Sequence, residues 1–402
     1  MLFSGVASTD IVICGAGVAG LTLAIRLAQL GRKSTVLEAR SESAVSTEGV
    51  FLTLAPNGMN GLKAIDCFAE VRAAGIITTG IELRNASGKR LACVEQADHE
   101  REFGAPSVTL GRGQLMAILV ARARSAGVDV RFDARLMAAN EHRDGIALQL
   151  STGERVEADI LVAADGLRST VREKLFPEYP GARFTGLIGT GGTAEASIPD
   201  TAGVMRMTFG DSAFFGYIKV HAKPLYWFNS YAASEPGDGK VEDPAAYAKA
   251  IFAMHANDPE PNATILRRAG RLERNYPIYD LPKLPSWHKE RVVLVGDAAH
   301  AVGPHAGQGA SMAIEDALVL AACMEGERDC EHAFSRYESL RSKRIEEVVA
   351  LTRANSAPKR LSSKLAILVR DLLLPFLVPL GIRAGRKLFR FRADLAPLAP
   401  PQ

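Results

Sequence analysis

The sequence predicts an α/β protein in which a domain built on a parallel sheet is interrupted by a mainly antiparallel sheet and followed by a C-terminal helix. Three observations support this fold class. The N-terminal segment has the order strand, helix, strand, which is typical of a parallel sheet. Residues 184–229 contain short apolar segments rich in glycine, threonine and aromatic side chains, which favours antiparallel strands. The pattern then returns to a buried strand followed by helices.

The opening unit is defined by three segments. An apolar run at 10–14 predicts a buried strand, and helical periodicity over 17–30 predicts a helix that ends before Gly31, where a left-handed glycine commonly follows a helix. A second apolar run at 34–37 predicts the next strand, which ends at Glu38. Together they form a β-α-β unit.

The rest of the chain is assigned by the same reasoning. We expect helices at 115–126, 315–325 and 331–354, strands at 129–132, 146–150, 155–158, 159–164 and 291–295, and loops at 234–244 and 257–262. The parallel-sheet domain is therefore expected to be discontinuous. Its segments are 1–78, 104–182 and 280–350, the inserted sheet domain comprises 79–103 and 183–279, and a helical tail comprises 351–402.

Composition excludes several classes of protein. The 402 residues are 47% hydrophobic and 23% charged, the mix of an ordinary globular protein rather than a disordered chain. A net charge of +3 gives no support for a nucleic-acid partner. The five cysteines have no CxxC spacing, so we expect free thiols in the cytoplasm and no metal site. The apolar stretches at 11–30 and 365–380 are interrupted, and we expect no transmembrane span.

The first chemical motif is Gly15-Ala-Gly17-Val-Ala-Gly20, which lies between the predicted first strand and helix. Gly15 permits a tight turn, Gly17 lets the backbone approach a pyrophosphate, and Gly20 allows the helix and strand to pack closely. Glu38 ends the second strand, where an acid accepts hydrogen bonds from ribose hydroxyls. This context predicts a dinucleotide site but does not by itself distinguish NAD from FAD.

Two further motifs follow buried strands, where ligands of such sheets bind. Asp165-Gly166 makes a sharp turn after the strand at 159–164, and Gly296-Asp297 ends the strand at 291–295. An acid at the latter place can accept hydrogen bonds from a polyol chain. The Gly307-Gln-Gly309 loop then leads into a helix, and the free N–H groups of a helix N-terminus suit a ring edge that becomes anionic on reduction.

In this order and spacing, the three motifs resemble those of the class A single-component FAD-dependent monooxygenases, a family that includes para-hydroxybenzoate hydroxylase, salicylate hydroxylase and the tetracycline-inactivating monooxygenases. The resemblance covers residues 8–350 and implies a Rossmann-like FAD-binding domain with a sheet-based substrate domain. It implies the following cofactor-binding residues: Gly15, Gly17, Ala19, Gly20, Glu38, Ala39, Arg40, Gly49, Val50, Arg112, Asp165, Gly166, Asp297, Gly307, Gly309, Ala310 and Ser311. It also links Ser169 and Arg172 to FAD and NADPH handling.

The family resemblance implies an activity. FAD reduced by NAD(P)H reacts with O2 to form a flavin hydroperoxide, which inserts one oxygen atom into an aromatic or polycyclic small molecule. Because the cofactor carries this chemistry, the lack of hydrolase, metalloprotease and P-loop motifs is expected. The alternative is an FAD-dependent reductase of a polyprenyl-like double bond, which would need no O2. A redox-inactive carrier and a halogenase are disfavoured, and we expect a cytoplasmic monomer or homodimer.

Further expectations concern the residues around the glycine-rich loop, the inserted sheet and the tail. Family members commonly carry Asn at the position of Ser311, which matters only if the side chain rather than the backbone contacts the flavin. His300 is expected to be structural, whereas Pro304 and His305 are candidates for a catalytic or substrate role. Tyr217 and Phe228 are expected to line the substrate pocket, with core packing as the competing interpretation. The basic, leucine-rich tail is expected to brace the two domains, with weak contact to a membrane surface as the alternative.

Overall fold

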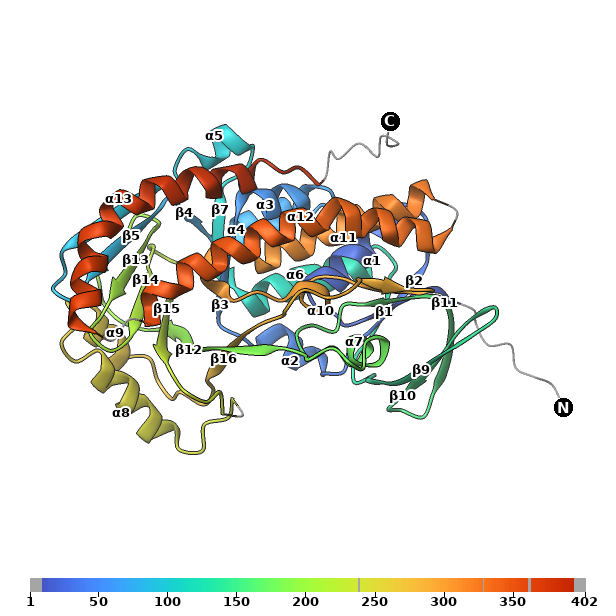
Figure 1. The fold of residues 1–402 in the computed structure, drawn as a ribbon, viewed down its shortest axis with the longest axis horizontal. Coiled ribbons are helices and arrows are strands. Elements are labelled where there is room, and N and C mark those ends of the chain that lie inside the picture. The colour runs from blue at the N-terminus through green and yellow to red at the C-terminus, as the bar shows by residue number, and fades with distance from the viewer. Residues whose placement is uncertain (1–8, 238, 328, 361–362, 394–402) are drawn as a thin grey trace.

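The structure is a computed structural model that describes residues 9–237, 239–327, 329–360 and 363–393. Three sheets and the helices packed on them make up the molecule (Figure 1). The largest apolar core lies between the first sheet and its helices.

The first sheet has eight strands, with β17-β18-β11-β1-β2-β8 as its main path and β10 and β9 added alongside β11. Their bounds are β1 Thr9–Cys14, β2 Ser34–Leu37, β8 Asp129–Arg131, β9 Leu136–His142, β10 Gly145–Leu150, β11 Arg155–Ala163, β17 His288–Lys289 and β18 Val292–Leu294. Strand β1 pairs in parallel with both β2 and β11, with Val12 opposite Thr35 and Leu161. This confirms the expected β-α-β opening. The two strands expected at 155–158 and 159–164 are one continuous strand, β11.

Helices cover this parallel sheet, as Figure 1 shows. Helix α1 (Val18–Gln29) contacts α11 (Gly309–Gly326), which in turn contacts α12 (Cys330–Ser356). Gly31 follows α1 with φ +74°, as expected for a left-handed glycine after a helix. Helix α11 begins six residues before the predicted start at 315, because its first turn has the small residues of the glycine-rich loop instead of an apolar repeat.

The second sheet has seven strands in the order β16-β12-β15-β14-β13-β5-β6. Their bounds are β5 Gly80–Asn85, β6 Arg90–Glu95, β12 Arg183–Ala194, β13 Val204–Phe209, β14 Phe214–Ile218, β15 Leu225–Ala232 and β16 Tyr276–Asp280. All neighbouring pairs are antiparallel except β13 with β5, which confirms the mainly antiparallel sheet. Apolar side chains of α8 (Pro244–Met254) and α9 (Asn262–Arg267) cover one face.

A small third sheet, β3-β7-β4, was not predicted. Its strands are β3 Phe51–Leu54, β4 Ile76–Thr78 and β7 Ser107–Gly111, and β7 leads directly into α6. The remaining short elements are α2 Glu42–Thr47, α3 Pro56–Lys63, α4 Phe68–Ala74, α5 His99–Phe103, α6 Arg112–Ser125, α7 Thr170–Leu175, α10 Asp297–His300 and the 3-10 turns η1 Pro304–Ala306 and η2 Ala357–Arg360. The strands are too short for a clear alternating pattern.

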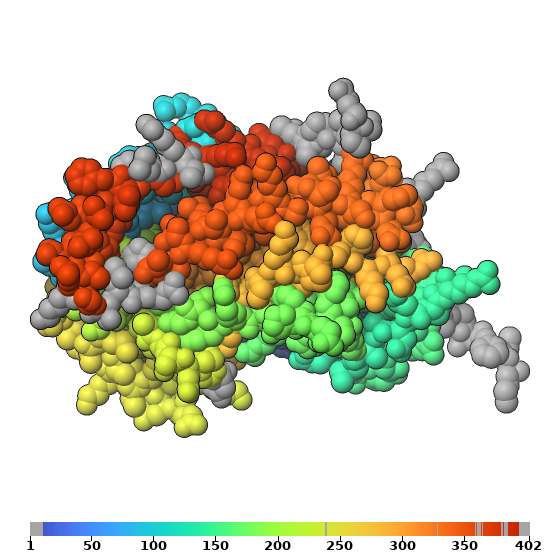
Figure 2. All heavy atoms as spheres, viewed as in Figure 1, coloured from blue at the N-terminus to red at the C-terminus, as the bar shows by residue number. Residues whose placement is uncertain are grey.

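The C-terminal tail continues α12 through η2 into a separate helix, α13 (Lys364–Phe389). Helix α13 touches both parts of the molecule. The Arg370 guanidinium lies 4.6 Å from the Phe209 ring centroid on the seven-stranded sheet, and Arg386 donates to Asp98 at 2.8 Å, next to α5. In Figure 2, α13 forms a red band at the surface beside the orange α12. No helix in the described ranges is both long and apolar enough to cross a membrane.

Candidate cofactor and substrate site

The glycine motif forms the turn that connects β1 to α1, and its three glycines have different roles. Gly15 has φ +108°, and a Cβ there would lie 2.3 Å from the Ala164 carbonyl oxygen. A Cβ on Gly20 would lie 2.0 Å from the Gly15 oxygen, so both positions exclude any side chain for internal reasons. At Gly17 the nearest atom would be 3.9 Å away. Gly17 therefore leaves open space at the N-terminus of α1, where a phosphate could approach.

Glu38 lies beside this turn at the end of β2. Its Oε2 accepts a hydrogen bond from the Ala16 N–H at 3.0 Å, and its Oε1 accepts bonds from the backbone and side chain of Arg40, both at 2.9 Å. Burial alone would raise the pKa of Glu38, but the hydrogen bonds from Arg40 and Ala16 lower it overall. The carboxylate is therefore ionised and serves as an acceptor. The Arg40 side chain is 35% exposed, so ribose hydroxyls could replace its bonds to Glu38.

Asp165 and Gly166 follow β11 at the same sheet edge. A Cβ on Gly15 would lie 3.1 Å from the Asp165 Cα, so the two motifs are in contact. Asp165 Oδ2 accepts from the Val171 N–H at 3.3 Å, whereas its buried Oδ1 has no partner among the described residues. Burial raises the pKa of Asp165. A buried acceptor without a donor is costly, and a ligand hydroxyl or amine could supply one.

Arg172 connects this motif to the next one. Its buried guanidinium donates to the carbonyl oxygens of Ala298 at 3.0 Å and Leu167 at 2.6 Å, and Ser169 caps α7 by accepting from the Arg172 N–H at 3.0 Å. These contacts join the Asp-Gly turn to α10. The structure therefore shows Ser169 and Arg172 as internal supports of the site.

Asp297 begins α10 after β18. Asp297 is exposed. Desolvation by the surrounding protein raises the pKa of its carboxyl group, and the charges of His300 and Arg112 oppose that rise. The carboxylate is therefore open to solvent and close to the charges of His300 and Arg112. Gly296 packs closely here, because a Cβ at this position would lie 3.2 Å from the Ala19 Cβ on α1.

Arg112 begins α6, and its charge acts on Asp297. Its N–H donates to the Val50 carbonyl at 3.1 Å, and a Cβ on Gly49, which has φ +97°, would lie 2.8 Å from the Arg112 Cδ. The Gly49-Val50 segment and Arg112 are therefore packed together. Within the described chain, no hydrogen bond or ion pair engages the exposed Arg112 guanidinium.

The Gly307–Ser311 loop forms the start of α11. Gly309, Ala310 and Ser311 occupy its first turn, where backbone N–H groups have no helical acceptor. The Ser311 side chain points inward, since its Oγ accepts from the Ala55 N–H at 3.3 Å and is fully buried. Only the backbone of this turn can therefore face a ligand, and an amide side chain at position 311 is not required for that.

A buried charge network supports this turn, and sequence reasoning missed it. Asp316 accepts from His300 Nε2 at 2.5 Å and from Arg341 Nε at 2.7 Å, and Arg341 also donates to Glu315 at 2.5 Å. Burial would raise the pKa of Asp316, but His300 and Arg341 lower it to about 2. His300 is therefore structural, as expected. The signal in the sequence is an acidic pair within an otherwise apolar helix, which requires buried partners.

Pro304 and His305 lie in η1, between this network and the seven-stranded sheet. The His305 carbonyl accepts from Asn355 Nδ2 at 3.1 Å, and its Nδ1 lies 3.2 Å from the Lys359 Nζ. Pro304 is exposed. Asn355 and Lys359 come from the end of α12 and from η2, so the tail reaches this loop, a contact that the sequence did not predict.

The two predicted substrate residues lie on opposite faces of the seven-stranded sheet, which corrects the expectation that they share a pocket. Tyr217 pairs with Trp227 and is buried in the cluster covered by α8 and α9. Phe228 pairs with Gly216 and faces β3, with its ring 6.0 Å from that of Phe51. Alternation along β14 and β15 separates them.

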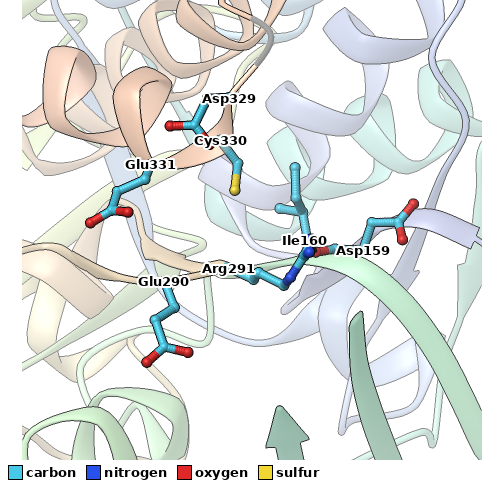
Figure 3. A pocket seen from close by; sticks show the side chains of 7 residues that line it. All are labelled: Asp159, Ile160, Glu290, Arg291, Asp329, Cys330 and Glu331. Carbon is cyan, nitrogen blue, oxygen red and sulfur yellow. Dashed lines mark hydrogen bonds between the residues drawn. The ribbon is translucent and has the colours of Figure 1, made fainter. Parts of the chain in front are cut away.

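An open cavity of about 500 Å³ lies elsewhere, just before the start of β18 and beside the middle of β11 (Figure 3). Figure 3 shows that its lining comes from the start of α12, the β17–β18 turn and β11. Its lining residues are Asp159, Ile160, Glu290, Arg291, Asp329, Cys330 and Glu331. Four carboxylates and one arginine make a poor site for an anionic dinucleotide, so we place the chemistry at the Gly15–Asp297 edge instead.

Comparisons with known proteins fit this geometry. A model of the FAD binding domain family matches residues 8–352, most of the chain. The chain belongs to this family. It is 29% identical to an aurachin C monooxygenase/isomerase of Stigmatella aurantiaca over 85% of this chain and 87% of that protein. It is 30% identical to a 3-hydroxybenzoate 6-hydroxylase of Aquipseudomonas alcaligenes, over 86% and 88% of the respective lengths.

Solved structures share the fold of the present chain. The FAD and uric acid complex of HpxO from Klebsiella pneumoniae has a TM-score of 0.82 and 23% sequence identity, and covers 96% of this chain and 97% of that one. The family member is an FAD-dependent monooxygenase of class A, with NAD(P)H as co-substrate. The Rossmann-like fold predicted from its three motifs is confirmed.

Proposed function

We propose that the chain uses NAD(P)H and O2 to insert one oxygen atom into an aromatic or polycyclic small molecule, with FAD held along the edge from Gly15 to Ser311. The observation that supports this most strongly is the convergence of the ends of β1, β2, β11 and β18, with the start of α11 beside them. The related hydroxylase and monooxygenase are similar over most of their lengths, which favours oxygenation over the alternative of a polyprenyl reductase.

The open space at Gly17 would take the FAD pyrophosphate, and the ionised Glu38 would accept bonds from the adenosine ribose. Asp165 Oδ1 and the exposed Asp297 carboxylate would accept hydrogen bonds from hydroxyl groups of the rest of the cofactor. These acceptors and the backbone amides of α11 suit a ligand with several hydroxyls and a phosphate end. Ala39, Arg40, Gly49, Val50, Arg112, Gly166, Gly307 and Gly309 complete the proposed contacts.

When bound, FAD supplies the redox and oxygen chemistry, and this chain's residues position the reactants and exclude water. The first-turn amides of α11 would favour negative charge at one edge of the ring. The buried Arg341–Glu315–Asp316 network holds that turn rigidly. Such preorganisation matters because a displacement of about 1 Å can cost on the order of 100-fold in rate.

The substrate would lie between this loop and the inner face of the seven-stranded sheet. Phe228 projects from β15 toward Phe51 on β3, and Phe214 lies beside it with ring centroids 5.9 Å apart. Aromatic side chains on one face suit a planar aromatic molecule. We assign 79–103 and 183–279 to the substrate domain, and 1–78, 104–182 and 280–350 to the FAD domain.

The experiment that tests this function is a turnover assay on the purified, FAD-loaded protein. NADPH oxidation is followed with a panel of aromatic and polycyclic compounds in air and under nitrogen. Oxygenation predicts that at least one compound accelerates NADPH oxidation and gains one oxygen atom in air only. A protein that cannot be loaded with FAD, or that reduces the compound under nitrogen, would refute the proposal.

We further propose that the molecule is a cytoplasmic monomer or homodimer whose α13 rests weakly on a membrane surface rich in anionic lipid. Seven large apolar side chains on α13 are 45–71% exposed, at helical spacing. They are Leu365, Leu368, Val369, Leu372, Leu373, Phe376 and Leu377. At ~1.5 Å per residue this stripe is ~18 Å long, whereas a bilayer core is about 30 Å thick. It can therefore lie on a bilayer but cannot cross one.

Charge favours lipid over a second copy as the occupant of this stripe. Between residues 359 and 392 the chain has nine basic residues and one acidic residue, Asp371, and four of the nine, Arg370, Arg386, Lys387 and Arg390, already form ion pairs within the molecule. Pairing two such helices would bring like charges together, whereas anionic headgroups would complement them. Co-sedimentation with vesicles of phosphatidylcholine, with and without phosphatidylglycerol, tests this. We expect Phe376→Ser to reduce binding to the anionic vesicles, and Leu340→Ser, on α12 and 50% exposed, to leave it unchanged. Equal binding by both variants would contradict the proposal.

A further inference from the structure

Lys359 is a cation placed where the proposed flavin loop and the proposed substrate face meet. It belongs to η2, the short turn that follows α12. Its Nζ lies 3.2 Å from His305 Nδ1, in the loop before α11, and 4.0 Å from the ring centroid of Phe214 on β14. One ammonium group therefore contacts both walls of the region assigned to the substrate.

The charge of Lys359 is not balanced by a carboxylate. In the described ranges no acidic side chain forms an ion pair with it. Its neighbours are the His305 ring from η1 and the Phe214 ring from β14, and the η2 turn itself packs against β15. Asn355 of α12, which donates to the His305 carbonyl, is uncharged. A charged ammonium donates to His305 Nδ1, which leaves its other N–H groups free to donate elsewhere.

The environment disfavours the charged form in the absence of a counter-ion. Burial lowers the pKa of Lys359 to about 7, and a cation–π contact with Phe214 offsets only part of the desolvation cost. An incoming anion would pair with this charge and complete its hydrogen bonds. A partly buried cation that has no anionic partner among the described residues, beside aromatic side chains, is the arrangement expected of a site for an aromatic acid.

We propose that Lys359, placed by His305 and Phe214, is the specificity-determining residue that binds an acidic oxygen of the substrate, a carboxylate or a phenolate, so that the preferred substrates are anionic aromatic compounds. This inference rests on the proposed function and deepens it. The sequence alone did not single out Lys359, because it lies among many basic residues of the tail.

The proposal predicts a pH dependence with a definite sign. Because an amine binds an anion only when protonated, carboxylate affinity should be greatest below about pH 7 and fall as the pH rises through that value. Well above it, the affinity should decline by about tenfold per pH unit until the pKa of the bound state intervenes. Neutral aromatic amides should show no such dependence.

Calorimetric titration of the FAD-loaded protein tests the proposal directly. The probes are salicylate, 3-hydroxybenzoate and 4-hydroxybenzoate, each compared with its uncharged amide. In the wild-type protein we expect at least one acid to bind more tightly than its amide. Lys359→Met should weaken that acid by tenfold or more and abolish its pH dependence, with less than a twofold effect on the amide. Lys359→Arg should restore most of the preference for the acid.

Two control measurements exclude a general loss of structure in Lys359→Met. Thermal unfolding and FAD content of Lys359→Met should match the wild type, because the residue is not placed on the cofactor. Equal weakening of acid and amide, unchanged acid binding, or no acid that binds more tightly than its amide would overturn the proposal. Oxygenation of neutral aromatics only would overturn it while leaving the proposed function intact, and failure to bind FAD would refute the function itself.

Discussion

Substituting Gly17 and Gly20 separately distinguishes a glycine that serves a ligand from one that serves the fold. Gly20→Ala places a Cβ 2.0 Å from the Gly15 oxygen, a backbone atom that cannot move without displacing the β1–α1 turn. Overpacking of this kind costs about 1–3 kcal/mol or more, a large share of the ~5–15 kcal/mol that stabilises a domain. We therefore expect Gly20→Ala to unfold at markedly lower temperature.

Gly17→Ala should leave the fold intact and weaken FAD binding. The backbone at Gly17 has φ −83°, which alanine adopts freely, and the nearest atom to its Cβ would be 3.9 Å away. Alanine reduces the entropy of the unfolded chain, which raises the free energy of unfolding by about 0.4–1 kcal/mol. Loss of glycine at the N-cap lowers the free energy of unfolding by a similar amount. The net stability change is thus close to zero, whereas a methyl group in the phosphate path should weaken FAD at least tenfold, about 1.4 kcal/mol.

The assay pairs calorimetric unfolding with FAD titration of the apoprotein by flavin fluorescence. Gly192→Ala on β12 is the matched control, because a Cβ there meets no atom within 4 Å and the residue lies on the other sheet. Unchanged FAD affinity in a folded Gly17→Ala protein would refute the placement of the pyrophosphate. Normal stability of Gly20→Ala would refute the packing argument.

Four further predictions follow from the same geometry. Glu38→Gln should weaken FAD binding. Because the pKa of Glu38 is lowered, its contribution to FAD affinity in the wild-type protein should be fully present above the usual carboxyl pKa of ~4.3 and be lost only as the pH falls below that value. FAD titrations from pH 4 to 8 would show this persistence. Arg341→Met removes the buried guanidinium that Glu315 and Asp316 share, leaving Glu315 with Arg344 and Asp316 with His300, and should cost about 3 kcal/mol in urea unfolding; a loss under 1 kcal/mol would argue against the network. Ser311→Ala should cost about 1 kcal/mol through its bond to Ala55 and leave FAD affinity unchanged, and tenfold weaker FAD would show that the side chain contacts the flavin. Phe228→Ala should raise KM for the aromatic substrate, whereas Tyr217→Phe should not; the opposite ranking would reverse the assignment of the two sheet faces.

The local motifs could be predicted because each depends on a few neighbouring residues. The β1–α1 turn requires glycine at 15 and 20 for contacts within a single unit, and the structure shows those contacts at 2.3 and 2.0 Å. Gly31 likewise follows α1 with positive φ. Such glycines can be predicted without knowledge of the tertiary structure, because the backbone conformation or the contact that excludes a side chain lies within a short segment.

The rest depended on contacts between distant segments. Whether Tyr217 or Phe228 faces the site is decided by which side of the sheet α8 and α9 cover, and alternation alone leaves that choice open. Lys359 and Arg341 look alike in sequence, as basic residues in helical stretches. The first lies against the Phe214 ring and the second is enclosed by Glu315 and Asp316, more than 20 residues earlier in the chain.

Isotope labelling directly tests oxygen insertion at a flavin held along the Gly15–Ser311 edge. The FAD-loaded protein, NADPH and an aromatic substrate identified in the turnover panel are incubated under ¹⁸O2, and the product mass is measured. Oxygen insertion predicts a product that carries one ¹⁸O atom for each NADPH coupled to its formation. A product that is reduced rather than oxygenated, formed equally well without O2 and free of ¹⁸O, would contradict it.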